Sequence, residues 1–461
     1  MSFNSYTFLY FFFIFYPIYI GIRYFNVPWK WLVLISSWFF YSWAYPPCFF
    51  LLLFSTLVNF YCGKAILEQP LKAKYFLKLS LFANLGVLCF FKYTTFLLAN
   101  LSYLSAFNFT GFSIILPIGI SFYTFQSMSY TIDIYRGKLT KKKDFLDFAL
   151  YVSFFPQLVA GPILFATHFL EQLNNEFKLS KINWERGFIS ILSGAVLKLV
   201  IADGLAPEVD AFFLEPSNYH TCAAWYYLFA YSAQIFCDFA GYSSIAIGLS
   251  TIMGFHIPRN FNSPYFSISI KDFWKRWHIS LSTWLREYLY ISLGGNRNGW
   301  YKTLRNLLIT MLLGGLWHGA GWNFIIWGAL HGVALAINHS ASILTSQFSS
   351  NLKKVITLFS IPTTLFFVMI CWVFFRSSSL NQVYHVLDTL WPSNFDLGRS
   401  VDYREKDLLL WFLLHHIISA FGYEKIKKYI SRPIRLIGII FLLELLYTSR
   451  AGGVPFIYFS F

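Results

Sequence analysis

The chain has 461 residues, of which 57% are hydrophobic and only 12% are charged. A soluble protein carries about 25% charged residues, so this composition excludes a soluble enzyme, a disordered protein and a secreted domain held by disulfides. The formal net charge is +15. In a polytopic membrane protein such an excess indicates cytoplasmic loops and anionic lipid rather than nucleic acid.

The first predicted element is a transmembrane helix at residues 6–22, which ends at Arg23. It lacks the basic start and the small-residue cleavage site of a signal peptide, so we expect it to stay in the membrane. An uncharged run follows at residues 31–63 and is broken at residues 45–47 by a Tyr-Pro-Pro sequence. At about 20 residues per span, this run predicts two helices joined by a tight turn.

Further uncharged runs lie at residues 93–132 and 306–352, with shorter apolar segments between and after them. Together they predict about 11 membrane-embedded helices. The sequence contains no internal repeat and no insert large enough for a soluble domain. We therefore expect residues 1–461 to form a single all-α membrane domain.

Residues 154–163 do not resemble a simple span, because Pro156, Gln157, Gly161 and Pro162 fall within ten positions. Irregular backbone at membrane depth is tolerated only where protein or a water-filled cavity satisfies its hydrogen bonds. This composition favours a re-entrant loop that lines a cavity. Such elements occur in transporters as well as in membrane enzymes, so both classes remain open at this point.

The stretch 259–305 has eight basic residues and two acidic ones, interleaved with aromatic side chains. Asp272 and Arg276 are four residues apart, which favours an amphipathic helix that continues through His278. One interpretation is an interfacial helix with an aromatic belt and lipid-facing basic residues such as Arg286. The other is a cytoplasmic opening that attracts a polyphosphorylated donor.

His318 lies in the middle of the uncharged run 306–352. A titratable group at such a place is a candidate for function, and imidazole can act as a general base near neutral pH. A histidine that only hydrogen-bonds between helices is the structural alternative. On a continuous helix His331 would lie about 220° around and ~20 Å along from His318, so the two would share a site only if the neighbouring glycines break the helix.

Common catalytic and metal-binding motifs are absent from the sequence. It has no HExxH, GxSxG, Walker or GxGxxG motif, and none of its 6 cysteines forms a CxxC pair. These absences argue against a metalloprotease, a serine hydrolase and a nucleotide-binding fold. We expect no metal site.

Six motifs follow one another along nearly the whole chain. They are GISFYTFQ through DIYRG at residues 119–137, FPQLVAGPI at 155–163, CDFAGYS at 237–243, DFWKRWHISLS at 272–282, LGGN at 293–296 and WHG at 317–319. In order and spacing they resemble the membrane-bound O-acyltransferase (MBOAT) family, in its bacterial alginate O-acetyltransferase type, which includes the peptidoglycan O-acetyltransferase A proteins. The match is specific for the family and much less specific for the substrate.

This resemblance implies an MBOAT fold, with tilted helices and re-entrant elements around a central tunnel. It implies that His318 is the catalytic residue and that His278 supports it. The implied donor is cytoplasmic acetyl-CoA, and no bound cofactor is expected. The acetyl group would cross the bacterial cytoplasmic (inner) membrane and reach an extracytoplasmic glycan, usually through a separate SGNH-type acetyltransferase partner.

Acetyl transfer from a thioester to a hydroxyl needs a general base and a hydrogen-bond donor to the developing oxyanion. His318 suits the first role, while His278, Asn296 or a backbone amide could supply the second. Trp317 is a further candidate for lining the tunnel. The basic residues of the stretch 259–305, Arg276 and Arg286 among them, are candidates for binding the phosphates of the donor.

The last seven residues, 455–461, are rich in aromatic side chains and uncharged apart from the terminal carboxylate. One interpretation is an interfacial aromatic anchor. The tail also resembles the aromatic C-terminal motif of the acetyltransferase branch of the family, and it presents one phenol, that of Tyr458. A tyrosine can form a covalent intermediate, which makes Tyr458 a candidate acyl relay between His318 and the partner.

Other functions remain as alternatives. D-alanyl or other acyl transfer from a carrier protein fits the same superfamily, and a small-molecule transporter fits the same hydropathy, although the chain has no internal repeat. The identity of the glycan is open. The shortness of the chain favours peptidoglycan, followed by an alginate-like or other polysaccharide.

Overall fold

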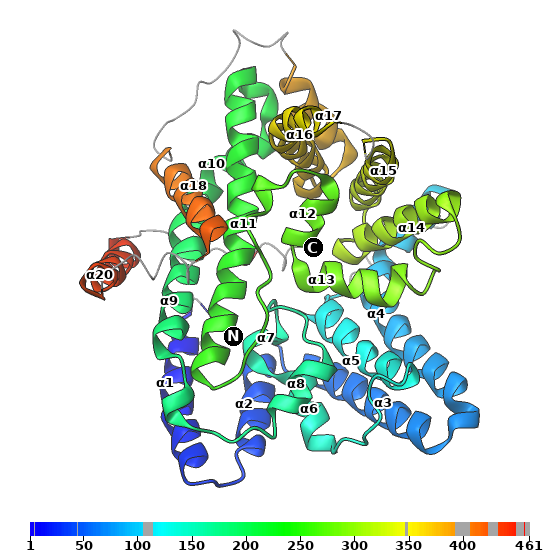
Figure 1. The fold of residues 1–461 in the computed structure, drawn as a ribbon, viewed down its shortest axis with the longest axis vertical. Helices are drawn as coiled ribbons and strands as arrows, with labels where there is room; N and C mark the ends of the chain where they lie inside the picture. The colour runs from blue at the N-terminus through cyan, green and yellow to red at the C-terminus, as the bar shows by residue number, and fades with distance from the viewer. Residues whose placement is uncertain are drawn as a thin grey trace. The chain divides into compact units, whose positions relative to one another are not determined.

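The structure is a computed structural model of the chain, and it describes residues 1–3, 5–43, 45–104, 114–345, 349–391, 406–422, 432–448 and 456. The regular elements of these residues are helices (Figure 1), which confirms the expected all-α class. By length and composition, seven of the described helical segments can cross a membrane. The sequence-based number also counted shorter apolar segments.

The seven candidate spans are Tyr6–Tyr24, Cys48–Glu68, Pro70–Ser102, Trp184–Leu214, Thr221–Ile252, Trp322–Ser342 and Phe359–Arg376. The chain divides into two compact units. The first unit comprises Met1–Ile191 and Tyr242–Pro258, and the second comprises Leu192–Gly241 and Arg259–Phe461. That residues 1–461 act as one membrane domain stays a prediction.

The helices of the first unit include membrane-length elements near its start and shorter ones. They are α1 (Tyr6–Tyr24), α2 (Lys30–Ser42), α3 (Cys48–Glu68), η1 (Pro70–Lys72), α4 (Ala73–Leu104), α5 (Ile120–Tyr135), α6 (Phe145–Ser153), α7 (Phe155–Leu158), α8 (Ala166–Gln172) and η2 (Leu179–Lys181), with most of α9 (Trp184–Ala195) and the end of α11 (Thr221–Ile252).

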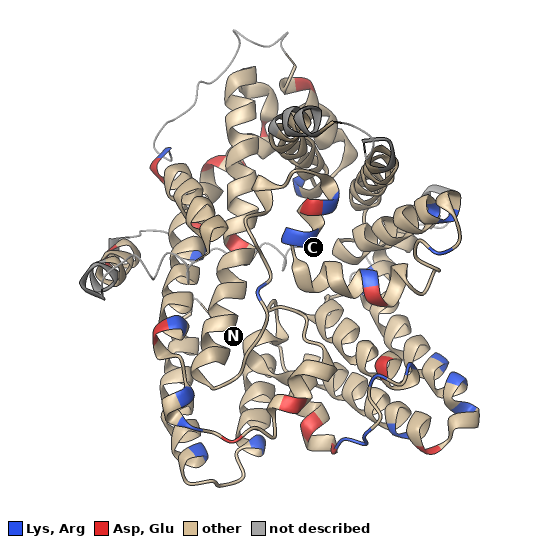
Figure 2. Ribbon diagram, in the orientation of Figure 1, with Lys and Arg blue, Asp and Glu red and all other residues tan. Residues whose placement is uncertain are grey.

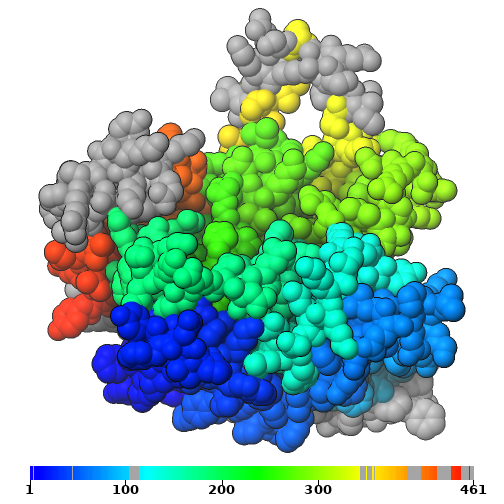
Figure 3. Space-filling view, turned by 60° about the horizontal axis from the view of Figure 1, so that its bottom comes forward, coloured from blue at the N-terminus to red at the C-terminus, as the bar shows by residue number. Residues whose placement is uncertain are grey.

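Helix α1 begins at the side chain of Ser5, which accepts a hydrogen bond from the backbone of the first turn. One face of α1 packs inside the first unit. The opposite face exposes large apolar and aromatic side chains, including Tyr6 at 80%, Tyr10 at 70% and Phe13 at 80%. Figure 3 shows this helix in dark blue at the surface. A helix face of this composition suits contact with lipid.

A buried polar network joins α3, α4 and α5 inside the first unit, and it includes a hydrogen bond of 3.0 Å between the hydroxyls of Ser55 on α3 and Ser127 on α5. The hydroxyl of Ser55 donates to Asn84 Oδ1 at 2.7 Å, and the hydroxyl of Ser80 donates to Asn59 Oδ1 at 2.7 Å. Asn59 Nδ2 donates to Asn84 Oδ1 at 3.1 Å. Because buried polar groups are costly unless they are bonded, these interhelical bonds hold the three helices in one register.

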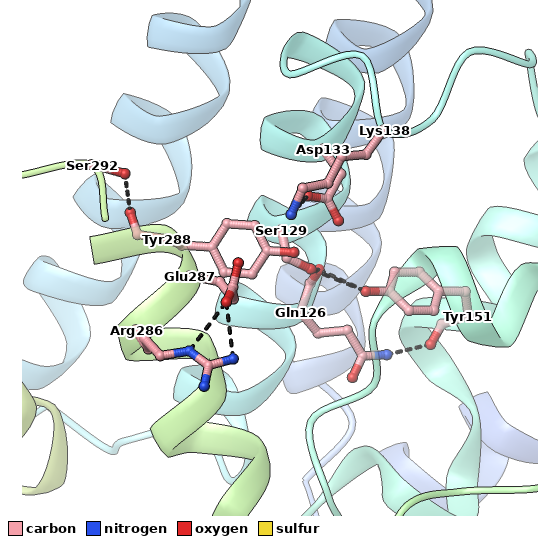
Figure 4. A network of polar contacts seen from close by, with 9 residues as sticks. All are labelled: Gln126, Ser129, Asp133, Lys138, Tyr151, Arg286, Glu287, Tyr288 and Ser292. Atoms are coloured by element: carbon pink, nitrogen blue, oxygen red, sulfur yellow. Dashed lines mark hydrogen bonds and ion pairs between the residues drawn. The ribbon is translucent and has the colours of Figure 1, made fainter. Parts of the chain in front are cut away.

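The segment 154–163 is not a span-length helix. It contains only the single turn α7 and continues as irregular buried backbone. Side chains from the neighbouring helices satisfy polar groups beside it. Gln126 donates to the backbone oxygen of Tyr151 (Figure 4) and accepts from Leu164 N at 3.3 Å. The hydroxyl of Tyr151 donates to Leu164 O at 2.9 Å. Protein groups thus provide the hydrogen bonds that irregular backbone needs.

Many basic residues of the first unit lie at or beside the connections that follow α1, α3 and α5 (Figure 2). Residues 43–47 and 105–119, which fall between them in the sequence, carry no charge. Lys and Arg are enriched in the loops on the cytoplasmic side of membrane proteins. Such an uneven distribution of basic residues is typical of a multi-pass membrane protein.

The second unit begins with the rest of α9. Its further helices are the π-helical η3 (Val196–Ala202), α10 (Asp203–Leu214), η4 (Pro216–Asn218), most of α11, η5 (Pro264–Phe266), α12 (Ile270–Arg276), α13 (Ile279–Trp284), the π-helical η6 (Leu285–Tyr290), α14 (Trp300–His318), α15 (Trp322–Thr345), α16 (Ser350–Arg376), α17 (Leu380–Thr389), α18 (Lys406–Phe421) and α20 (Arg432–Thr448).

Helices α14 and α15 form an antiparallel hairpin in the second unit with very close backbones. A Cβ atom on Gly315 would collide with the backbone oxygen of Phe324, and a Cβ atom on Gly328 would collide with that of Met311. Glycine is required at both positions because only glycine permits this approach. The seam brings the end of α14 next to the start of α15, and this is where His318 lies.

Candidate active site

His278 occupies the break between α12 and α13, so the expected continuous helix through this residue is wrong. Its backbone has φ 41° and ψ 56°, in the left-handed region that residues other than glycine rarely adopt. Its side chain is 0% exposed. A strained backbone persists only where the surroundings hold it, and such positions cluster at functional sites. His278 is therefore a functional candidate on physical grounds as well as by resemblance.

Asn260 holds the backbone at this break. Its carbonyl accepts from Ile279 N at 2.9 Å, and its side-chain Oδ1 accepts from both the backbone and the hydroxyl of Ser280, at 3.1 and 2.9 Å. Asn260 is 1% exposed. These three bonds fix the residues directly after His278 and thereby support its strained conformation. The sequence analysis missed Asn260, whose only signal is a polar residue in the loop before α12.

His318 is the last residue of α14. The next residue, Gly319, is extended, and a Cβ atom there would collide with the ring of Phe324. The glycine thus allows the chain to turn directly after the helix and pass close to this ring. His318 is 4% exposed, so its imidazole is buried at the end of the helix.

Trp317 joins the two histidines in one aromatic cluster. The centroid of its indole lies 6.1 Å from the imidazole of His278 and 4.9 Å from that of His318. The ring of His318 also lies 5.1 Å from Trp327 and 5.2 Å from Phe375. The structure thus brings together three of the residues expected from the sequence, namely His278, Trp317 and His318.

His331 belongs to the same cluster, because the helix breaks after His318 and the chain turns back. The indole of Trp327 lies 5.1 Å from the ring of His318 and 4.7 Å from that of His331. The glycines after His318 were the only sequence signal for this arrangement. His416, in contrast, accepts a hydrogen bond from the backbone of Tyr265 at 3.2 Å, which is a structural role.

A cluster of buried charged side chains adjoins the aromatic cluster, because Asp238 directly precedes Phe239 in the chain. Lys198 Nζ lies 2.7 Å from Asp203 Oδ1 and 2.6 Å from Asp238 Oδ1, and all three side chains are at most 5% exposed. The next residue on α11, Phe239, presents its ring to His278 at 4.6 Å and 89°. Charges at this depth are expensive and mark functional regions. The sequence analysis missed Lys198 because it lies in an otherwise apolar segment.

The two arginine candidates occupy different places in the second unit. Arg276 ends α12 and pairs with Asp272 at 2.9 Å, as their spacing of four residues on a helix allows. Arg286 lies on η6, is 63% exposed at its side chain and pairs with Glu287 at 3.0 Å (Figure 4). Arg286 is thus accessible to a charged ligand, whereas Arg276 is partly buried.

Of two further candidates, one is exposed and the other is not among the residues that the structure describes. Asn296 is exposed, in the turn that follows η6, whereas His278 and His318 are buried. Tyr458 lies outside the described residues. Of the tail, the structure describes Phe456, which is 2% exposed and whose ring lies 5.5 Å from that of Phe239.

The chemistry of the cluster is that of imidazole in apolar surroundings. His278 lies outside the seven candidate spans, and burial lowers its pKa to about 3, so its ring is neutral near pH 7. A neutral imidazole can donate one hydrogen bond and accept another. Within the described ranges, no group of three or more His, Cys, Asp and Glu residues is arranged to hold a metal ion.

The regular elements of the described residues are helices, and buried histidines at helix breaks of a membrane protein suit an enzyme that uses acid–base chemistry. The model of the MBOAT, membrane-bound O-acyltransferase family, matches residues 138–380. The chain is also 39% identical to a "probable alginate O-acetylase" of Azotobacter vinelandii, over 94% of this chain and 87% of that one.

Two further relatives extend the comparison. The chain is 38% identical to a peptidoglycan O-acetyltransferase of Helicobacter pylori, over 78% of this chain and 73% of that one. It is 33% identical to a teichoic acid D-alanyltransferase of Streptococcus thermophilus, over 48% of this chain and 56% of that one. The chain therefore belongs to the membrane-bound O-acyltransferase family, and it is a multi-pass acyltransferase of the bacterial cytoplasmic membrane.

Proposed function

We propose that the protein takes an acetyl group from cytoplasmic acetyl-CoA and passes it across the membrane for O-acetylation of an extracytoplasmic glycan. The observation that carries this proposal is the buried pair His318 and His278, both in ring contact with Trp317. The relatives named as alginate and peptidoglycan O-acetyltransferases support acetyl as the group transferred.

His318 is the general base in this proposal. Its imidazole takes the proton of the acceptor hydroxyl while the oxygen attacks the acetyl carbon of the thioester. The C–S bond then breaks, and the leaving thiolate takes the proton back from the imidazolium. His278, held neutral by burial, or a backbone amide donates to the oxyanion. The apolar rings around His318 exclude water and so suppress hydrolysis of the thioester.

Tyr458 is the proposed acceptor of the first transfer. Phe456, two residues earlier, is buried against Phe239, whose ring also contacts His278. This packing supports a tail that docks close to the histidines. An acetyl ester on the phenol of Tyr458 divides the transfer into two steps. An extracytoplasmic SGNH-type partner then collects the acetyl group and delivers it to the glycan.

The donor enters from the cytoplasmic side in this proposal. The excess of basic residues in the stretch 259–305 and the exposure of Arg286 support attraction of the phosphates of acetyl-CoA. No bound cofactor takes part. For the glycan, the relatives named for alginate and for peptidoglycan support both acceptors, so the test includes both.

The test uses purified protein in detergent with acetyl-CoA labelled in the acetyl group. We expect wild-type protein to release CoA and to label a soluble SGNH-type partner, which then labels either peptidoglycan or alginate. His318→Ala should do neither. Use of a D-alanylated carrier protein in place of acetyl-CoA would instead favour the D-alanyltransferase relatives, and solute uptake into vesicles without labelling would favour a transporter.

A further inference from the structure

His331 is a fully buried histidine on α15 that the proposed mechanism does not use. It is 0% exposed. The indole Nε1 of Trp274 donates a hydrogen bond to His331 Nδ1 at 3.3 Å. Because Nδ1 accepts this bond, the proton of the neutral ring is on Nε2. The structure thus assigns the tautomer and the direction of the second donor.

This second donor has no acceptor in the part of the chain that the structure describes. The Nε2 atom of His331 is buried and forms no hydrogen bond with any described residue. Aromatic rings surround the imidazole, with Phe273 stacked on it at 6.2 Å and 11° and Phe367 edge-on at 5.5 Å. An unsatisfied buried donor costs free energy that an apolar side chain would not. The hydrogen bond from Trp274 accounts for Nδ1 of His331 but not for Nε2.

The position of His331 indicates which ligand supplies the acceptor. Trp327 contacts the rings of both His318 and His331. An acyl group at His318 is therefore separated from His331 by the width of an indole. The reacting carbonyl is at His318, so the acceptor for His331 belongs to a more distant part of the same donor molecule.

We propose that His331 Nε2–H donates a hydrogen bond to an amide carbonyl oxygen of the pantetheine arm that carries the acetyl group. This inference rests on the proposed acetyl transfer. The arm is flexible and contains two amides, which need hydrogen-bond partners wherever they are buried. His331 is accordingly a donor-binding residue, whose contact forms in the ground state and persists during transfer.

The test compares two thioesters that differ in this amide. S-acetyl-N-acetylcysteamine carries the first amide of the arm, whereas S-butyl thioacetate has none. Purified full-length protein in detergent is assayed by thiol release. His331→Phe keeps an aromatic ring without the donor, and His331→Met is a second donor-free variant if the phenylalanine does not fit. His331→Gln keeps a donor, and His339→Phe on the same helix is the matched control.

We expect His331→Phe to lower kcat/KM for the amide-bearing thioester about tenfold, mainly through KM. The amide-free thioester should change by less than about twofold, and His331→Gln should recover most of the loss. Acetyl-CoA and an acetylated carrier protein carry the same arm, so both should show the His331 effect if both are used, and the donor that wild-type protein turns over identifies the natural source.

Two results separate the possible failures. Equal loss for both thioesters, or no loss for either, would overturn the role of His331 and leave it as support for Trp274. A wild-type protein that turns over neither thioester nor acetyl-CoA would refute the proposed acetyl transfer, and this inference with it.

Discussion

The imidazole of His278 and the indole of Trp317 lie 6.1 Å apart, with an angle of 68° between their planes. Trp317 directly precedes His318 at the end of α14. Its indole therefore contacts both His278, at the break after α12, and His318, at the end of α14. A shift of either helix end would move both imidazoles. The variants of each histidine are therefore tested for folding as well as for activity.

Replacement of His318 by alanine should abolish acetyl transfer, with a loss of at least about 100-fold in kcat. The removed imidazole acts in the transition state, and the remaining rings can still pack around the gap. Glycan acetylation in cells and acetyl-CoA turnover by purified protein measure the effect.

The matched control is His339→Ala, on α15 and away from the cluster of rings. Expression level and elution as a single species in detergent should be unchanged for both variants. Near wild-type glycan acetylation by His318→Ala would exclude His318 as the base.

Replacement of His278 separates strain from chemistry. Because its φ is 41°, His278→Gly should relieve backbone strain, and His278→Ala should be less stable than His278→Gly by about 1 kcal/mol. Both variants should lose most activity, since neither can donate to the oxyanion. Thermal unfolding in detergent and acetyl-CoA turnover are measured on the same samples.

An active His278→Gly protein would show that the conformation matters and the imidazole does not. An alanine variant as stable as the glycine variant would contradict the strain at this position.

The part of the candidate site that could be predicted from the sequence consists of residues in short motifs. His318 and His278 stand in short motifs, and an isolated histidine in an uncharged run is visible without a structure. The break at His278 was not predictable, because the helical spacing of Asp272 and Arg276 is correct for α12, which ends at Arg276. The backbone directly after the break is held by Asn260, which lies 18 residues before His278 in the chain.

The buried ion cluster shows the same limit. Lys198 and Asp238 are 40 residues apart and on different helices, so no local pattern relates them. The all-α membrane class, in contrast, follows from composition and run length, because an uncharged run of about 20 residues or more has the length of a membrane-spanning helix rather than of a strand. The positions of the buried charged residues depend instead on contacts between segments that are far apart in the sequence.

Loss of Lys198 should destabilise the protein strongly. Lys198→Met leaves Asp203 and Asp238 buried without their cation, and breaking a buried pair in this way costs about 3–5 kcal/mol. The apparent Tm in detergent should fall accordingly. Lys142→Met is the control, because its partner Glu68 is on the surface, and it should not change the Tm measurably. Equal effects of the two variants would contradict the assignment of Lys198 to a buried cluster.

Replacement of Arg286 tests donor attraction. Its exposed guanidinium acts on the phosphates before chemistry, so Arg286→Gln should raise KM for acetyl-CoA about 3-fold at low salt and leave kcat unchanged. High salt should remove the difference, because screening shortens the reach of exposed charges. Arg286→Lys keeps the charge and should behave as wild type. Unchanged kinetics in Arg286→Gln across acetyl-CoA concentrations would make Arg286 a lipid anchor.

The last prediction concerns Tyr458 in the aromatic tail. Tyr458→Phe keeps the ring, its packing and its affinity for the membrane, and it removes only the hydroxyl that would carry the acetyl group. If the phenol is the relay, this variant should still bind acetyl-CoA but should pass no acetyl to the SGNH-type partner. Labelled acetyl-CoA followed by mass spectrometry of the C-terminal peptide detects the ester directly.

Phe456→Ala is the companion variant, because Phe456 packs against Phe239 beside His278. It keeps the nucleophile but weakens the docking of the tail, so it should lower the rate of transfer without abolishing it. The relay predicts that Tyr458→Phe is inactive and Phe456→Ala is slow. An aromatic anchor predicts the reverse order, since the hydroxyl is then dispensable and the packed ring is not. Wild-type glycan acetylation by Tyr458→Phe would therefore reduce the tail to an anchor.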